Sequence, residues 1–146
     1  MRAVLHLIAA ALLAFATAPP VAAQSGAVTV YKTATCGCCK LWVDHLRNAG
    51  FQVQVHDLAD VAPHKARLGV PPQLASCHTA VVDGYVIEGH VPAADVQRLL
   101  AMRPAVTGIA VPGMAMGSPG MEFGPAVAYD VIAFEPDGTL ELFASH

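Results

Sequence analysis

Alternating apolar and polar residues predict strands in four parts of the chain. The segments AVTVYKT, from Ala27, and FQVQVHD, from Phe51, alternate as a strand with one buried face does. In HTAVVDGYVIEGHV, from His78, two apolar runs flank Asp83-Gly84, a dipeptide typical of a two-residue β-hairpin. Near the end of the sequence, AYDVIAF and TLELFASH flank residues 135–138 and predict a second hairpin.

Other segments predict helices. From Cys38, apolar residues recur every three or four positions, and Asn48-Ala49-Gly50 supplies a stop signal. Residues 61–68 predict a short helix that ends before a Gly-Val-Pro-Pro segment. Pro92 opens a third helix that runs to Met102, because the first turn of a helix needs no N–H from proline.

The order of these elements predicts the fold class. Strand, thiol motif, helix, strand, helix, hairpin and helix follow one another as in thioredoxin-like proteins. We therefore expect an α/β fold with a mixed sheet flanked by helices, formed by residues 24–103. Residues 104–146 are expected to extend the same domain, first as a loop rich in Met, Gly and Pro and then as the final hairpin.

The first 23 residues have the features of a cleaved export signal. Arg2 precedes an apolar run from Leu7 to Ala16, and Val21-Ala22-Ala23 places small residues where a signal peptidase cuts. The alternative is a membrane anchor, but this run is shorter than the roughly 20 residues needed to cross a bilayer. We expect a signal peptide at 1–23, a periplasmic protein and no membrane association after cleavage.

Charge limits the class of partner. Without Arg2, the chain has seven Lys and Arg against eleven Asp and Glu. Nucleic acids require a basic surface to meet their phosphates, so this balance argues against a nucleic-acid partner.

Three of the four cysteines lie in the segment TCGCCK. Cys36 and Cys39 have the spacing of a redox pair, whereas Cys38 and Cys77 need another explanation. The motif is expected at the N-terminus of a helix, where unpaired N–H groups and the helix dipole favour the thiolate, both a nucleophile and a metal ligand. A structural disulfide with one spare thiol is the simpler alternative.

The segment Ser76-Cys77-His78-Thr79 occupies the loop that carries a cis-proline in thioredoxin-like folds. Cys77 and His78 are therefore expected to face Cys36 and Cys39. Together they offer a thiolate and an imidazole, which suit Cu(I) and tolerate Cu(II). The alternatives are a buried apolar role for Cys77 and a structural hydrogen bond for His78.

Three methionines, Met114, Met116 and Met121, lie in the Gly- and Pro-rich part of the extension. Thioethers are soft ligands for Cu(I), so these residues are candidates for a metal-binding lid over the thiols. The alternative is that these methionines only fill gaps in the packing.

Five other histidines are assigned to the surface or to structural roles: His45, His56, His64, His90 and His146. Of these, His90 is the closest to an exception, because the end of the hairpin can approach the site.

Three segments together resemble the CopG-type periplasmic copper-resistance proteins, a thioredoxin-like family formerly described as a domain of unknown function. They are YKTATCGCCKLW, VPPQLASCHTAVVDGYVIEGHVP and GIAVPGMAMGSPGME, and the resemblance spans about residues 28–143. It implies copper binding through the Cys-x-Cys-Cys thiols and the Cys-His pair.

Two functions remain at this point. The favoured one is a copper-binding protein that sequesters or redox-cycles copper, with copper ions and other periplasmic copper-handling proteins as partners. The alternative is a thiol-disulfide oxidoreductase with Cys36 as nucleophile and Cys39 as resolving thiol. A structural zinc site is weaker, because the methionines and the export signal favour copper.

Overall fold

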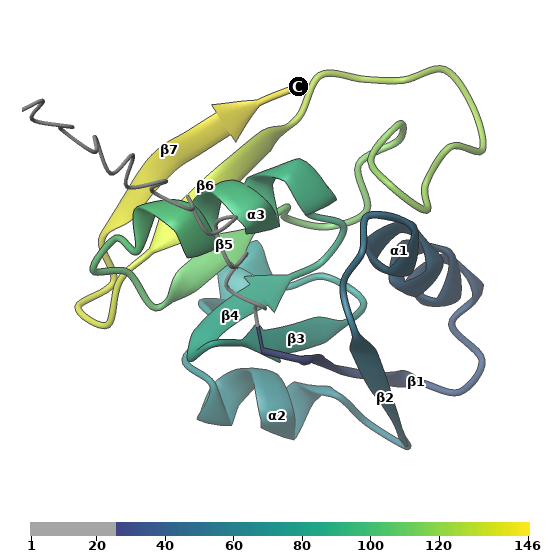
Figure 1. The fold of residues 1–146 in the computed structure, drawn as a ribbon, viewed down its shortest axis with the longest axis horizontal. Coiled ribbons are helices and arrows are strands. Elements are labelled where there is room, and N and C mark those ends of the chain that lie inside the picture. The colour runs from purple at the N-terminus through teal and green to yellow at the C-terminus, as the bar shows by residue number, and fades with distance from the viewer. Residues whose placement is uncertain (1–25) are drawn as a thin grey trace, which may run out of the picture.

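A seven-stranded sheet forms the centre of the molecule in a computed structural model that describes residues 26–146 (Figure 1). The strands are β1 (Val28–Thr33), β2 (Val53–Leu58), β3 (Thr79–Val82), β4 (Tyr85–Glu88), β5 (Gly108–Ala110), β6 (Asp130–Phe134) and β7 (Leu140–Ser145). Their order across the sheet is β2-β1-β3-β4-β5-β6-β7. β1 pairs in parallel with β2 and β4 with β5, while the other pairs are antiparallel, so the sheet is mixed. The predicted signal peptide lies outside the described residues.

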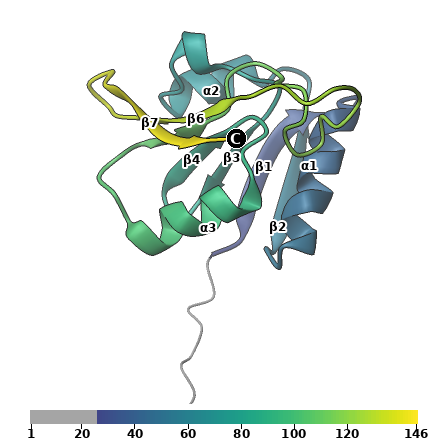
Figure 2. The same ribbon diagram turned by 90° about the horizontal axis from the view of Figure 1, so that it is seen from above.

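Helices cover both faces of the sheet (Figure 2). They are α1 (Gly37–Asn48), α2 (Ala62–Arg67), α3 (Ala93–Met102) and the short 3-10 turn η1 (Pro72–Leu74). The larger apolar core joins α1 and α3 to one face, through Trp42, Leu46 and Leu99 among others. A smaller core on the opposite face packs Leu74 of η1 against Phe134 of β6.

The predicted α/β class and the predicted order of elements are confirmed. β1, α1 and β2 form a parallel crossover unit, and β3 and β4 form the hairpin that follows α2. The hairpin turn has the expected chemistry, because Asp83 and Gly84 both have positive φ, at 48° and 87°. A turn that needs two positive φ values is the reason for an Asp-Gly pair at this position.

The extension contains one strand that the sequence did not predict. Residues 104–125 were expected to be loop, but Gly108–Ala110 forms β5 between β4 and β6. Gly108 permits this pairing, since a Cβ at this position would lie 2.0 Å from the Val86 carbonyl oxygen. The final hairpin is confirmed as β6 and β7, and its pairing with β5 continues the sheet.

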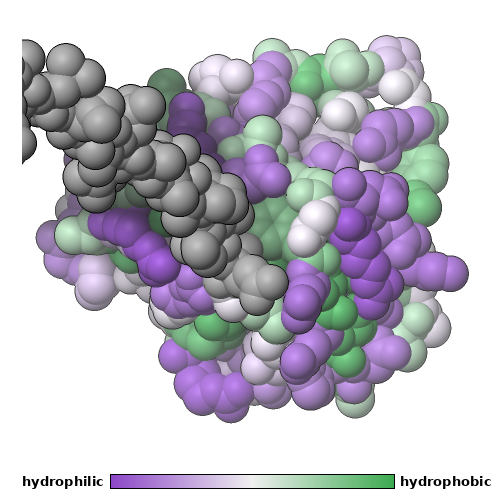
Figure 3. Space-filling view, in the orientation of Figure 1, coloured by the Kyte–Doolittle hydropathy of each residue, from purple (hydrophilic) through white to green (hydrophobic). Residues whose placement is uncertain are grey.

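The surface seen in Figure 3 is mainly hydrophilic where α1 lies in Figure 1. Lys40 and Arg47 are exposed on this helix, whereas Trp42, Val43 and Leu46 are buried. This two-sided pattern is the one that predicted the helix. Within residues 26–146, no helix is long and apolar enough to cross a membrane.

Candidate metal centre

The thiol motif is placed at the start of α1. Cys36 is the N-cap residue, and its Sγ accepts a hydrogen bond from the Cys39 N–H at 3.3 Å. Cys36 and Cys39 form a disulfide, while Cys38 and Cys77 are free and half-buried. Cys39 is fully buried, so Cys36 is the more accessible sulfur of the pair.

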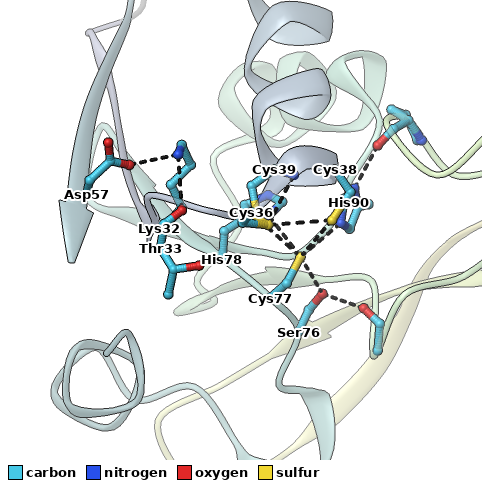
Figure 4. The surroundings of a disulfide bond; sticks show 12 residues. Lys32, Thr33, Cys36, Cys38, Cys39, Asp57, Ser76, Cys77, His78 and His90 are labelled. Atoms are coloured by element: carbon cyan, nitrogen blue, oxygen red, sulfur yellow. Dashed lines mark hydrogen bonds and ion pairs between the residues drawn. A yellow bond between two sulfur atoms is a disulfide. The ribbon is translucent and has the colours of Figure 1, made fainter. Parts of the chain in front are cut away.

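Cys77 lies opposite the motif, on the loop between η1 and β3 (Figure 4). Its Sγ is 3.5 Å from the Cys39 Sγ and 3.9 Å from the Cys38 Sγ. The Cys38 Sγ lies in turn 3.5 Å from the Cys36 Sγ. The four sulfur atoms are all within 4.8 Å of one another, so the structure brings together all four cysteines named from the sequence.

Two histidines contact Cys77. The Nδ1 atom of His78 is 3.4 Å from the Cys77 Sγ, and the Nε2 atom of His90 is 3.0 Å from the same sulfur. His78 was a predicted site residue, whereas His90 was assigned with the surface and structural histidines and is fully buried beside the site. Cys77, His78 and His90 form a second group of potential metal ligands that shares Cys77 with the first.

The hairpin register contains the signal that identifies His90. An Asp-Gly turn pairs Val82 with Tyr85, and counting outward pairs Thr79 with Glu88. The Gly89 N–H then donates to the His78 carbonyl oxygen at 3.0 Å. His90 is the next residue, so it lies at the same end of the hairpin as His78.

Burial keeps the two imidazoles in the neutral form. Burial lowers the pKa of His78 well below 6.5, and the pKa is lowered further because a proton on His78 would be repelled by any proton on His90 and by the charge of Lys65. Burial also lowers the pKa of His90, although a hydrogen bond with the Pro119 carbonyl oxygen opposes this shift. A neutral imidazole has a lone pair on one nitrogen, so each ring can act as a metal ligand.

The pKa of Cys77 shifts upward, in the opposite direction to the pKa of the two histidines. Burial, followed by the neighbouring Cys38, raises the pKa of Cys77 to about 12. Without a metal ion this thiol therefore stays protonated at neutral pH, and a metal must displace the proton to bind.

A buried polar network fixes the loop that carries Cys77. The Glu88 carboxylate is completely buried and accepts hydrogen bonds from Lys65 Nζ at 2.6 Å and from the Ser76 N–H at 2.6 Å. Its second oxygen accepts from the Thr79 hydroxyl at 2.7 Å. The network thus joins β4, α2 and both ends of the Ser76–Thr79 segment.

The loop that carries Met114, Met116 and Met121, called the methionine loop below, reaches the site at two points. The Ser76 hydroxyl donates to the Gly113 carbonyl oxygen, next to Met114. Gly120 packs so closely that a Cβ would lie 2.7 Å from the Cys38 carbonyl oxygen. Met114 is 55% exposed, Met116 is half-buried and Met121 is buried, so their role as ligands stays a prediction.

The remaining histidines make other contacts. His45 Nε2 accepts from the Ala93 N–H at 3.0 Å, and His146 Nε2 lies 2.7 Å from Asp95 Oδ2. His56 and His64 pack against Tyr31.

Comparisons with known proteins place this site in a family. The family model described as a protein of unknown function, DUF411, matches residues 74–121, which include Cys77, His78 and His90. The solved structure named copper resistance protein CopG, Form 2, is 48% identical, with a TM-score of 0.78 over 82% of this chain and 97% of that chain. The structure named CopG, Form 1, is 47% identical, with a TM-score of 0.79 over 84% of this chain and 98% of that chain.

The chain belongs to the CopG copper resistance family. A comparison with the curated proteins gives no match. In this CopG-family protein, the Cys and His cluster is a group of side chains able to bind a metal ion.

Proposed function

We propose that the protein binds copper through Cys36, Cys38, Cys39 and Cys77 together with His78, and thereby sequesters or redox-cycles copper as part of copper resistance. The observation that carries this proposal is the group of four sulfur atoms within 4.8 Å of one another. The name of the two similar structures, copper resistance protein, supports copper as the metal.

The distances between the sulfur atoms suit a common metal ion. Metal–sulfur bonds of about 2.3 Å in tetrahedral geometry place two bound sulfurs about 3.8 Å apart. The contacts from Cys38 to Cys36, from Cys39 to Cys77 and from Cys38 to Cys77 measure 3.5, 3.5 and 3.9 Å. Thiolates are soft ligands and favour Cu(I), whereas the imidazole of His78 also accepts Cu(II). The Cys36–Cys39 disulfide must be reduced before all four sulfurs can bind.

The location and partners follow from the N-terminal sequence and the metal. Residues 1–23 are proposed to direct export to the periplasm, where copper ions and other copper-handling proteins are the partners. N-terminal sequencing of the exported protein should give a chain that begins near Gln24. Recovery of the full-length chain in the membrane fraction would contradict this proposal.

The methionine loop is proposed to supply soft ligands at the entrance to the thiols. Its Gly113 end is joined to the Cys77 loop by the Ser76 hydrogen bond, and its Gly120 end packs on Cys38. The triple variant Met114→Leu, Met116→Leu and Met121→Leu should slow the transfer of Cu(I) from a chelator to the protein. An unchanged rate would leave these residues with a packing role.

A Cu(I) competition assay tests the main proposal. Under anaerobic conditions, the reduced native protein should take Cu(I) from a chromogenic chelator far better than Cys36→Ser or Cys77→Ser. His56→Ala, on the exposed side of β2, is the matched control and should behave as the native protein does. Equal Cu(I) affinity in the native protein and both cysteine variants would remove these residues from the site.

A second function is favoured by the disulfide itself. Cys36 and Cys39 are bonded at the N-terminus of α1, with Cys36 more accessible than Cys39. This arrangement suits a thiol-disulfide oxidoreductase in which Cys36 attacks a substrate disulfide and Cys39 resolves the mixed disulfide. Disulfide exchange does not require Cys38, whereas the proposed copper site uses it as a ligand. A substitution of Cys38 therefore distinguishes the two functions.

A further inference from the structure

The disulfide of the thiol motif is accessible from one side. Cys36 is half-buried and Cys39 is fully buried, so an incoming thiol meets the Cys36 sulfur. The chain neighbours of Cys36, Thr35 and Gly37, are both exposed, and a Cβ on Gly37 would meet nothing within 4 Å. The space beside the Cys36 sulfur is therefore open to another molecule.

The protein's own thiols cannot open this disulfide by themselves. The Cys38 Sγ lies 3.5 Å from the Cys36 Sγ, and the Cys77 Sγ lies 3.5 Å from the Cys39 Sγ. Exchange with either free thiol moves the disulfide to another pair of cysteines, but the chain still contains one disulfide and two thiols. Reduction of the disulfide needs two electrons from another molecule.

Large apolar side chains are exposed on the two elements next to the disulfide. Leu41, in the second turn of α1, is 44% exposed, and Phe123, on the methionine loop, is 65% exposed. Met114, on the same loop, is also exposed. Phenylalanine and methionine are enriched in protein–protein interfaces, where their burial removes apolar surface from water.

The methionine loop brings Phe123 to the side of α1. A Cβ on Gly120 would lie 2.7 Å from the Cys38 carbonyl oxygen, so the loop and the helix are in contact three residues before Phe123. Burial lowers the pKa of His45 on α1, and the charge of Glu122 opposes this shift, which places the residue before Phe123 near the same helix. Figures 1 and 2 both show the loop running beside α1.

We propose that the Cys36–Cys39 disulfide is the substrate of a partner protein that carries a reduced Cys-x-x-Cys pair and docks on Leu41 and Phe123. This inference rests on the proposed copper function, because only the reduced cysteines bind Cu(I) as a group of four. The protein is the substrate in this reaction. In the oxidoreductase described above, by contrast, Cys36 itself attacks another disulfide.

The exchange takes two steps. A thiolate of the partner attacks the Cys36 Sγ and forms a mixed disulfide, while the bond to Cys39 breaks and the Cys39 sulfur leaves with the electron pair and takes up a proton. The second thiol of the partner then loses its proton and attacks the partner's sulfur in the mixed disulfide, which releases Cys36. The partner ends as a disulfide, and Cys36 and Cys39 are both reduced.

The start of α1 favours the second step. The Cys39 N–H donates to the Cys36 Sγ at 3.3 Å, and Cys36 is the N-cap residue of the helix. A hydrogen bond from the backbone and the positive end of the helix dipole both stabilise a thiolate. Cys36 is therefore a good leaving group when the partner's second thiol attacks.

Reduced bacterial thioredoxin, which carries a Cys-x-x-Cys pair, is the probe. Oxidised native protein is mixed with thioredoxin or with the same concentration of dithiothreitol, the reaction is stopped in acid, and alkylated thiols are counted by mass spectrometry. The count should rise from two to four per chain as the disulfide opens, and it should rise faster with thioredoxin. A rate no faster than that of dithiothreitol would overturn the inference and leave a small thiol as the reductant.

Substitutions test the docking surface. Phe123→Ser and Leu41→Ser should each slow reduction by thioredoxin at least about fivefold, as expected when one contributing interface side chain is removed. Leu142→Ser is the matched control, since Leu142 is 64% exposed but lies on β7, at the opposite edge of the sheet from β2. Dithiothreitol should reduce all three variants at the native rate, because a small thiol does not contact the docking surface. Native thioredoxin rates in Phe123→Ser and Leu41→Ser, or an equal loss in Leu142→Ser, would overturn the inference.

The attacked sulfur is identified with thioredoxin that lacks its resolving cysteine. In a Cys38→Ser background the adduct cannot move from Cys36 to Cys38, and mapping after an acid quench should find thioredoxin on Cys36. An adduct on Cys39 would contradict the proposed first step.

A Cu(I) titration keeps this inference apart from the copper function. After reduction with dithiothreitol, the native protein and Phe123→Ser should bind the same amount of Cu(I). If both bind Cu(I) and thioredoxin has no advantage over dithiothreitol, only this inference fails. If thioredoxin opens the disulfide rapidly and the reduced protein binds no Cu(I), the copper function fails and the docking surface stands.

Discussion

The buried carboxylate of Glu88 accepts a hydrogen bond from the Ser76 N–H at 2.6 Å, directly before Cys77. The same carboxylate is paired with Lys65 Nζ at 2.6 Å. An ionic group on β4 therefore holds the loop that presents Cys77 to the thiol motif.

Glu88→Gln should cost about 3–5 kcal/mol of unfolding free energy, because it leaves the Lys65 charge without its partner in a buried place. Urea denaturation measures this loss. Asp57→Asn is the matched control, since Asp57 also pairs with a lysine, Lys32, at 2.7 Å, but its side chain is 52% exposed. The control should cost no more than about 1 kcal/mol. Equal losses of unfolding free energy in the two variants would show that burial does not increase the contribution of the Glu88–Lys65 pair to stability.

The sequence predicts what is encoded locally and misses what depends on contacts. The alternation in β1 and the helical period in α1 each report one buried face, so both elements follow from short stretches of sequence. β5 has only three residues in a Gly- and Pro-rich stretch, too few to show a period. The four cysteines could be grouped from the order of the elements, because the loop before the third strand was expected to face the thiol motif. His90 could not be identified from residue type, since its place depends on the register of the β3–β4 hairpin.

Acid should destabilise the protein through its buried histidines. The pKa of His78 is lowered well below 6.5 in the folded state, mainly by burial. Below pH 6.5 the unfolded chain therefore binds a proton that folded His78 does not, and the free energy of unfolding falls as the pH falls. The slope is up to about 1.4 kcal/mol per pH unit for each such histidine. His78→Gln should make the slope shallower in urea titrations between neutral and mildly acidic pH. An identical slope in the native protein and the variant would contradict this explanation.

Gly120 should be sensitive to substitution because the methionine loop meets α1 at this residue. A Cβ on Gly120 would lie 2.7 Å from the Cys38 carbonyl oxygen and 2.9 Å from the Trp42 backbone nitrogen. Gly113→Ala is the matched control, since Gly113 also has positive φ, 65° against 84° for Gly120, but its Cβ would meet nothing within 4 Å. Both variants carry the strain of a positive φ, so the extra loss in Gly120→Ala, roughly 1–3 kcal/mol, measures the close contact. Thermal unfolding of the two variants gives the difference, and equal transition temperatures would mean that the loop does not press on α1.

The role of Cys38 separates copper binding from disulfide exchange. Its Sγ lies 3.5 Å from the Cys36 Sγ and 3.9 Å from the Cys77 Sγ, so it can share a metal ion with both. An exchange reaction needs only an attacking thiol and a resolving thiol, which Cys36 and Cys39 supply. For that reaction a third thiol in the motif adds only a risk of wrong pairing.

The most direct test of the copper function is the copper content of reduced Cys38→Ser, measured anaerobically beside its disulfide reductase activity and compared with the native protein. We predict that the variant retains the reductase activity of the Cys36 and Cys39 pair and binds clearly less Cu(I), because one of four clustered thiolates is lost. Unchanged Cu(I) binding together with lost reductase activity would contradict the account and identify the protein as a thiol-disulfide oxidoreductase.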